Sequence, residues 1–144
     1  MLGIAVASGK VGCVLVADGE LEHTQLSSKA AHSPEVAVEF LEDWIRDLQP
    51  NFIVTEEAYR ASRKAAHVRA IIAALADYAN TTKINNAAIA RTQRCANKYE
   101  EAALLAIKYP QLEPSVPHKR KLWEAEPRQM IVFEALALAE AVTA

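Results

Sequence analysis

The order of strand-like and helix-like segments near the N-terminus is the feature that most constrains the fold. All four glycines lie within the first nineteen residues, among short β-branched runs. Ser8-Gly9-Lys10 and Asp18-Gly19 are turn signals that suit tight hairpin loops. The β-branched runs at 4–6 and 11–16 flank the first turn, and the alternating segment 20–27 follows the second. This arrangement predicts an antiparallel meander of three strands.

A helix and a buried strand follow the meander. Ser33-Pro34-Glu35 combines an N-cap, a proline suited to the first helical position and an acid near the positive end of the helix dipole. Apolar residues recur on one stripe from Val36 to Leu48, and Gln49-Pro50 ends the helix. Residues 52–55 have the composition of a short buried strand. Strand, helix and strand in this order predict a right-handed crossover, which places 52–55 parallel to the first strand.

The rest of the chain is predicted to be mainly helical. Helices are expected over 62–79 and over 97–109, and a short strand is expected over 82–85. In the second of these helices, Leu104 and Leu105 are predicted to form the core face.

Prolines divide the C-terminal part without creating a second domain. Four of the six prolines lie between residues 110 and 127, together with a basic run. This segment is predicted to be an extended loop without regular structure, after which Pro127 opens a last helix. A chain of 144 residues is the size of one ordinary domain, so a single domain is expected over 1–144.

Composition and termini bear on the compartment. No apolar run approaches the ~18 residues of a membrane span, and the N-terminus lacks the features of a secretory signal. Cys13 and Cys95 match no metal-binding or redox spacing, so both are predicted to be buried thiols in a reducing environment. We expect a soluble cytoplasmic protein.

The two parts of the chain differ in charge. The net charge is −2 overall, but residues 1–59 carry three basic and ten acidic residues, and residues 60–144 carry thirteen basic and eight acidic residues. This asymmetry predicts a basic face on one side of the molecule. The alternative is that these lysines and arginines only solvate helix surfaces.

Three segments resemble a known family. The run from Gly3 to Gly12 is similar to the opening Gly-Ile-Asp-Pro-Gly-Ser-x-x-Thr-Gly of RuvC-like Holliday-junction resolvases, which belong to the ribonuclease H superfamily. The segment ending at Glu56 resembles that family's fourth strand, and 134–139 resembles its last helix. The resemblance implies an α/β ribonuclease H-like fold, in which a mixed five-stranded sheet is flanked by helices.

The same resemblance implies a metal-dependent nuclease site that is incomplete here. In the family, four carboxylates hold two Mg²⁺ (or Mn²⁺) ions that activate water for phosphodiester cleavage. Glu56 and Glu134 stand at two of these positions and are the predicted catalytic and metal-binding residues. Ala5 and Ile131 stand where the family has the other two acids. Because neither side chain can bind a metal, cleavage activity is expected to be weakened or lost.

Our leading interpretation is therefore a RuvC-like protein that binds DNA, including branched DNA, without cutting it. Phosphate contacts would come from basic and polar side chains, while several of these side chains could instead only solvate the surface. The predicted nucleic-acid-binding residues are Ser8, Lys10, Arg60, Arg63, Lys64, His67, Arg69, Arg91, Arg94, Lys98, Lys119, Arg120 and Lys121. The resemblance also implies a homodimer.

Two other interpretations remain open. In one, the nuclease is active with displaced ligands from Glu57, Glu124 or Glu126, or Ala5 is an engineered replacement of an aspartate. Glu56 and Glu57 are adjacent in a strand and point to opposite faces, which weakens the first version. In the other, the chain is a protein-interaction module without a nucleic-acid role. Its candidate interface aromatics are Trp44, Trp123 and Tyr59, although Trp44 fits a core stripe.

Overall fold

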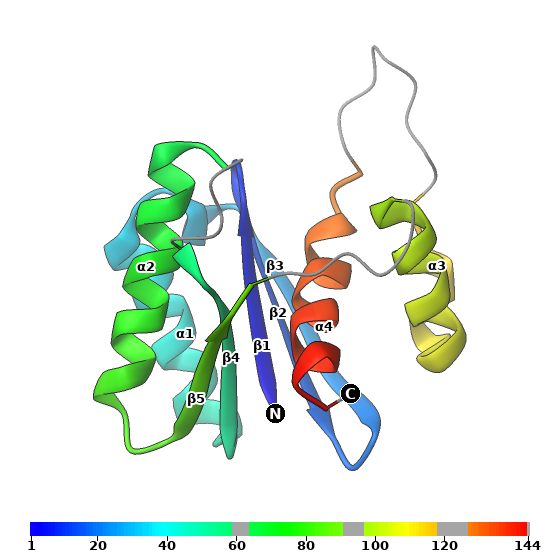
Figure 1. Cartoon of the computed structure of the whole chain (residues 1–144), viewed down its shortest axis with the longest axis horizontal. Coiled ribbons are helices and arrows are strands. Elements are labelled where there is room, and N and C mark those ends of the chain that lie inside the picture. The colour runs from blue at the N-terminus through cyan, green and yellow to red at the C-terminus, as the bar shows by residue number, and fades with distance from the viewer. Residues whose placement is uncertain (59–63, 91–96, 118–126, 144) are drawn as a thin grey trace.

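A mixed five-stranded sheet forms the centre of the molecule (Figure 1). The computed structural model describes residues 1–58, 64–90, 97–117 and 127–143. The strands are β1 (Leu2–Ala7), β2 (Lys10–Ala17), β3 (Glu20–Ser27), β4 (Phe52–Glu56) and β5 (Asn85–Ile89), in the spatial order β3-β2-β1-β4-β5. Strands β1, β2 and β3 pair antiparallel, whereas β4 pairs parallel with both β1 and β5. The predicted meander and the predicted parallel strand beside β1 are confirmed.

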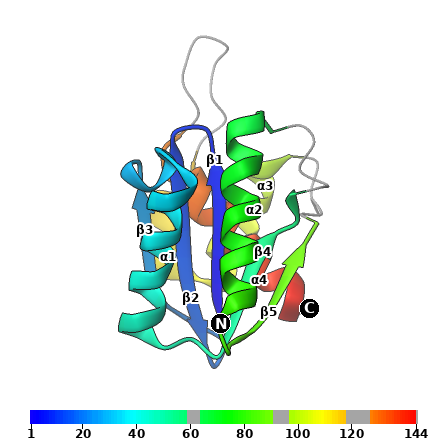
Figure 2. The same ribbon diagram turned by 90° about the vertical axis from the view of Figure 1, so that its left-hand side faces the viewer.

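Helices cover both faces of this sheet. The bounds are α1 (Pro34–Leu48), α2 (Ala66–Thr81), α3 (Lys98–Lys108) and α4 (Met130–Thr143). Helices α1 and α2 lie on one face, as Figure 2 shows with both in front of the sheet. Helix α4 lies on the other face, with α3 on its outer side (Figure 1). No helix in the described parts of the chain is both long and apolar enough to cross a membrane.

The predicted boundaries of α1 are confirmed by local interactions. The Ser33 hydroxyl accepts a hydrogen bond from the Val36 N–H at 3.2 Å, and Pro34 occupies the first turn. Gln49 ends the helix in the left-handed conformation, with its N–H bonded to the Ile45 carbonyl at 2.9 Å.

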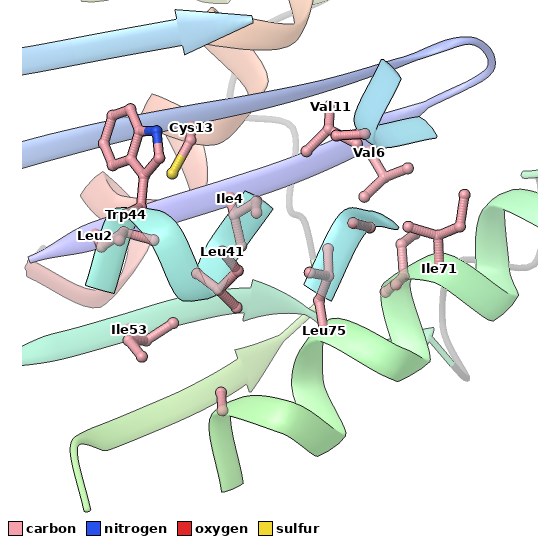
Figure 3. Packing of buried hydrophobic residues seen from close by; sticks show 14 of the residues in the cluster. Leu2, Ile4, Val6, Val11, Cys13, Leu41, Trp44, Ile53, Ile71 and Leu75 are labelled. Carbon is pink, nitrogen blue, oxygen red and sulfur yellow. The ribbon is translucent and has the colours of Figure 1, made fainter. Parts of the chain in front are cut away.

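The core between the sheet and α1 and α2 is apolar. Leu41 and Trp44 of α1 pack with Ile4, Cys13 and Ile53 of the sheet (Figure 3). The prediction that Cys13 is a buried thiol is confirmed, while Cys95 lies outside the described residues. Trp44 is a core residue, and its indole Nε1 donates to the Gln25 Oε1 at 2.5 Å.

Helix α4 packs unusually close to β1 and β2. A Cβ atom on Gly3 would lie 2.5 Å from the Ala135 carbonyl oxygen, and one on Gly12 would lie 2.7 Å from the Ile131 carbonyl oxygen. Only glycine fits at both positions, because the backbone of the helix occupies the space.

Strand β5 begins three residues later than predicted. The Thr82 hydroxyl donates to the Ala79 carbonyl at 2.7 Å, and the Asn86 side-chain amide donates to the Ala79 and Ile84 carbonyls at 3.2 and 3.1 Å. These bonds hold the end of α2 and the following turn together. The prediction of a strand over 82–85 is therefore wrong in position.

Three further features also differ from prediction. Helix α2 begins at Ala66, because Ala65 has extended backbone angles, and residues 62 and 63 lie outside the described part. Leu104 is 57% exposed, because α3 turns the small side chains of Ala102 and Ala106 toward the core instead. The segment 110–127 is not entirely irregular, since Pro110–Ser115 forms a 3-10 helix, and α4 begins at Met130.

Candidate nucleic-acid interface

The candidate site lies at the end of the sheet where β1 and β4 finish. Gly3 and Val54 are parallel partners, and both lie on the face that α4 covers. Ala5 and Glu56 lie two residues further along their strands, so they share this face. Glu56 is only 6% exposed, which is unusual for a carboxylate at the end of a strand.

Apolar groups fill the two positions at which the resemblance to RuvC-like proteins predicted acids. Ala5 is buried in the cluster beneath α4 and pairs with Gly12 across β1 and β2. The Ile131 backbone lies directly against Gly12, and the Ile131 side chain is buried in the same cluster as Ala5. Neither residue offers an oxygen or nitrogen donor from its side chain.

Lys64 provides the positive charge next to Glu56. Its ammonium lies 2.7 Å from the Glu56 Oε2 and also donates to the Val6 carbonyl oxygen at 2.7 Å. Both distances are typical of charge-assisted hydrogen bonds. Lys64 was predicted as a phosphate contact, and the structure places its ammonium on the end of the sheet instead of leaving it in solvent.

A second pair of charges lies at the start of α4. Glu134 is buried on α4, and the Lys10 ammonium donates to the Pro127 carbonyl at 3.4 Å. Partial burial lowers the pKa of Lys10, the nearby charge of Glu134 raises it, and the positive charge of Arg128 lowers it again. Glu134, Arg128 and Lys10 are therefore electrostatic neighbours.

Sequence reasoning missed Arg128, which is exposed at the start of α4. The signal that could have found it is its position directly after Pro127, which was predicted to open the last helix. Arg128 lies beside the turn between β1 and β2, because the Lys10 ammonium at that turn contacts the carbonyl of Pro127, the residue before Arg128.

The other predicted phosphate contacts are divided between surfaces. Ser8 is exposed in the turn between β1 and β2, next to Lys10. His67 and Arg69 are exposed near the start of α2, which lies on the opposite face of the sheet, and Lys98 is half-buried at the start of α3. The remaining predicted residues lie outside the described parts: Arg60, Arg63, Arg91, Arg94, Lys119, Arg120 and Lys121. All these contacts stay predictions.

The four helices start at the same end of the sheet as the candidate site. Strands β1, β4 and β5 run toward this end, and each of the four helices leads the chain away from it (Figure 1). The positive ends of the helix dipoles therefore lie at this end of the sheet.

The donor set does not fit a pair of divalent ions. Within the described residues, no group of three or more histidine, cysteine, aspartate or glutamate side chains could hold a metal. Glu56 is bonded to an ammonium, and Ala5 and Ile131 supply no ligand. Among the proposed substitute ligands, Glu57 follows β4 with its N–H bonded to the Ile89 carbonyl at 2.8 Å. Glu124 and Glu126 lie outside the described residues, as do the candidate interface aromatics Trp123 and Tyr59.

A separate cavity of about 600 Å³ lies at the opposite end of the sheet. Its lining includes Gln49, Tyr109 and Glu140. The Tyr109 hydroxyl donates to the Glu140 carboxylate, and the Lys108 ammonium lies 2.7 Å from the Glu140 Oε2. This cavity is remote from the ends of β1 and β4.

The strand order, the three-stranded meander and the crossover define an α/β fold of the ribonuclease H-like class. No protein-family model matches the chain. No curated protein matches it either. Among solved structures, the chain is similar to T. thermophilus RuvC in complex with Holliday junction substrate, with a TM-score of 0.59 and 17% identity over 96% of this chain and 90% of that chain. The predicted RuvC-like fold is therefore confirmed, and the low identity limits the likeness to the fold.

Proposed function

We propose that this chain is a RuvC-like DNA-binding protein that binds branched DNA without cleaving it. The observation that carries the proposal is that the Lys10 ammonium contacts the Pro127 carbonyl at 3.4 Å and interacts with the positive charge of Arg128, beside the turn at Ser8 and at the end of the sheet where β1 and β4 finish. Two cations beside an exposed hydroxyl are suited to phosphate groups of a DNA backbone.

Electrostatics at this end supports an anionic partner. Arg128 is exposed, and the lowered pKa of Lys10, caused first by its partial burial, indicates that its charge is incompletely solvated. Glu134 already interacts with the Lys10 charge, and Arg128 adds a second positive charge that a phosphate would offset. The helix dipoles whose positive ends lie at this end of the sheet would add to the attraction.

The site chemistry supports binding without cleavage. Two-ion hydrolysis requires a set of oxygen ligands that holds both metals in place. Here the side chains of Ala5 and Ile131 supply no ligand, and the Lys64 ammonium is bonded to one oxygen of the Glu56 carboxylate. A homodimer that presents two such ends to a two-fold symmetric junction forms part of the proposal, and light scattering coupled to size exclusion tests it.

The decisive experiment measures binding of labelled four-way junction, duplex and single-stranded DNA by fluorescence anisotropy. Lys10→Gln and Arg128→Gln should each weaken junction binding roughly tenfold near 0.1 M salt and should lower the salt-dependence slope by about 0.9, because each removes one phosphate contact. Lys83→Gln is the matched control, since Lys83 is exposed in the turn before β5, at the opposite end of the sheet.

Equal binding by all three variants would overturn the placement of the DNA-binding surface. No binding to any substrate at about 50 mM salt would overturn the nucleic-acid function itself. Metal-dependent cutting that is lost in Glu56→Gln would show an active nuclease.

A second candidate function is protein binding, which the outer side of α3 favours. Leu104 and Ile107 are exposed and lie three residues apart, so they share one side of the helix. Leu104→Glu with Ile107→Glu should leave junction binding unchanged. If the same double substitution removes self-association or the binding of a protein partner, α3 is an interaction surface.

A further inference from the structure

We propose that Lys64 replaces a divalent cation at the end of β4, so that this end of the sheet is held together by a charge that belongs to the chain itself. The proposal concerns contacts within the protein and stands independently of DNA binding.

The geometry of the ammonium is that of a bridging cation. One oxygen of Glu56, at the end of β4, and the carbonyl oxygen of Val6, near the end of β1, each lie 2.7 Å from the Lys64 Nζ. An ammonium has three donors and no acceptor, so it can satisfy two oxygens from different strands at once. Lys64 therefore links β1, β4 and the segment leading into α2.

The surroundings suit an ammonium better than a divalent ion. Mg²⁺ requires near-octahedral coordination by oxygen atoms at about 2.0–2.1 Å, whereas a lysine needs only a few acceptors at hydrogen-bond distance. On the face shared with Glu56, the neighbouring positions Ala5 and Ile131 are apolar and buried. A divalent ion at this point would lack most of its oxygen ligands, whereas the Lys64 ammonium is satisfied by the Glu56 and Val6 oxygens.

The local charge balance leads to the same conclusion. Two buried carboxylates face α4 or lie on it in this region, Glu56 and Glu134. Each has a lysine as an electrostatic neighbour: Lys64 is bonded to Glu56, and Lys10 lies close enough to Glu134 for their charges to interact. Lys64 and Lys10, with Arg128 close to Lys10, already offset the two carboxylates, so two divalent ions would leave an excess of positive charge at a buried site.

The replacement is expected to be reversible by changing two residues. Removing the Lys64 ammonium frees the Glu56 oxygen and the Val6 carbonyl, and Ala5→Asp adds a carboxylate on the same face. The double variant Lys64→Ala with Ala5→Asp should therefore acquire a divalent-cation site that the unmodified protein lacks.

The test measures Mn²⁺ binding by electron paramagnetic resonance, together with thermal unfolding in Mg²⁺, Mn²⁺ or chelator. For the unmodified protein, and for the control Lys83→Ala, the unfolding midpoint should not change between Mg²⁺, Mn²⁺ and chelator. The double variant should bind one Mn²⁺, and its midpoint should rise by about 9 °C at Mn²⁺ concentrations about 100-fold above the dissociation constant. Adding Glu56→Gln should abolish that binding.

Two results would overturn the proposal. One is Mn²⁺ binding by the unmodified protein that disappears in Glu56→Gln. The other is a folded double variant that gains no metal.

A charge-removal cycle keeps the proposal testable if the double variant does not fold. Lys64→Met should lower the unfolding midpoint by about 10 °C, because it leaves a buried carboxylate without its cation. Lys64→Met combined with Glu56→Gln should recover at least half of that loss. Additive losses in the combined variant would contradict a direct pairing of the two charges. None of these readouts involves DNA, so failure here is distinct from failure of the proposed DNA binding.

Discussion

Gly12→Ala is the substitution that most directly tests the close approach of α4 to the sheet. The new Cβ would lie 2.7 Å from the Ile131 carbonyl oxygen, 2.9 Å from its carbonyl carbon and 3.0 Å from its Cγ2. Two of these three atoms belong to the helix backbone, which cannot rotate away as a side chain can. The helix must therefore move, or the strand must.

The magnitude follows from two opposing effects. Replacing a glycine in a strand by alanine would otherwise stabilise the fold by roughly 0.5–1 kcal/mol, because the unfolded chain loses freedom. Overpacking a well-packed core typically costs about 1–3 kcal/mol and occasionally more. Because the clash is with backbone, we place the cost at the upper end and expect a net loss of about 2 kcal/mol.

The assay is thermal unfolding followed by circular dichroism, with urea unfolding as a second measure. For 144 residues, the entropy of unfolding near the midpoint is roughly 0.3 kcal/mol/K, so the midpoint should fall by about 7 °C. Thr24→Val, on the exposed side of edge strand β3, is the control and should change stability by less than about 0.5 kcal/mol. An unchanged or raised midpoint for Gly12→Ala would refute the close packing of α4 on β2.

Further predictions concern three other contacts. Burial first, and then Glu140, raise the pKa of Tyr109 above its usual value, so the protonated hydroxyl stabilises the folded state. That stabilisation is fully present below about pH 10 and is lost as the pH rises through the folded-state pKa. Tyr109→Phe should therefore reduce the loss of stability at alkaline pH, measured by urea unfolding. Burial lowers the pKa of Lys10, so Lys10 should lose its charge, and the protein its junction affinity, earlier in a series of rising pH than the Lys10→Arg variant does. Fluorescence anisotropy across that pH series measures the difference. Trp44→Phe removes the hydrogen bond to Gln25 and should cost about 1–2 kcal/mol in urea unfolding, and no loss would show that the bond is dispensable.

Much of the secondary structure could be predicted because it depends on neighbours along the chain. Gly9 and Gly19 have φ of 79° and 78° in the two predicted turns, a conformation that glycine adopts at little cost. The cap at Ser33 and the left-handed residue Gln49 bound α1 where expected. The position of β5 was missed because the Asn86 side chain contacts the backbone at the end of α2, which no local pattern indicates.

The candidate site could be predicted only in part. The resemblance identified Glu56 and Glu134, and the structure buries both carboxylates at the face that α4 covers, while their catalytic role stays a prediction. The charge partner of Glu56 could not be predicted, because a basic run indicates positive charge without indicating which oxygen each side chain reaches. The proximity of Arg128 to Lys10 could not be predicted, because it depends on the segment at Pro127 meeting the turn between β1 and β2.

The sequence by itself determined the three-stranded meander, the helical crossover, the parallel strand and the apolar identity of Ala5 and Ile131. These follow from turn residues, apolar periodicity and residue identity, which are properties of short segments. Only the tertiary structure decided that Lys64 bridges Val6 and Glu56 and that Lys10 meets the start of α4. Lys64 and Val6 are 58 positions apart, and Lys10 and Pro127 are 117 apart. Such contacts arise only when the sheet closes and the helices pack on it, because no local signal encodes which distant segments meet.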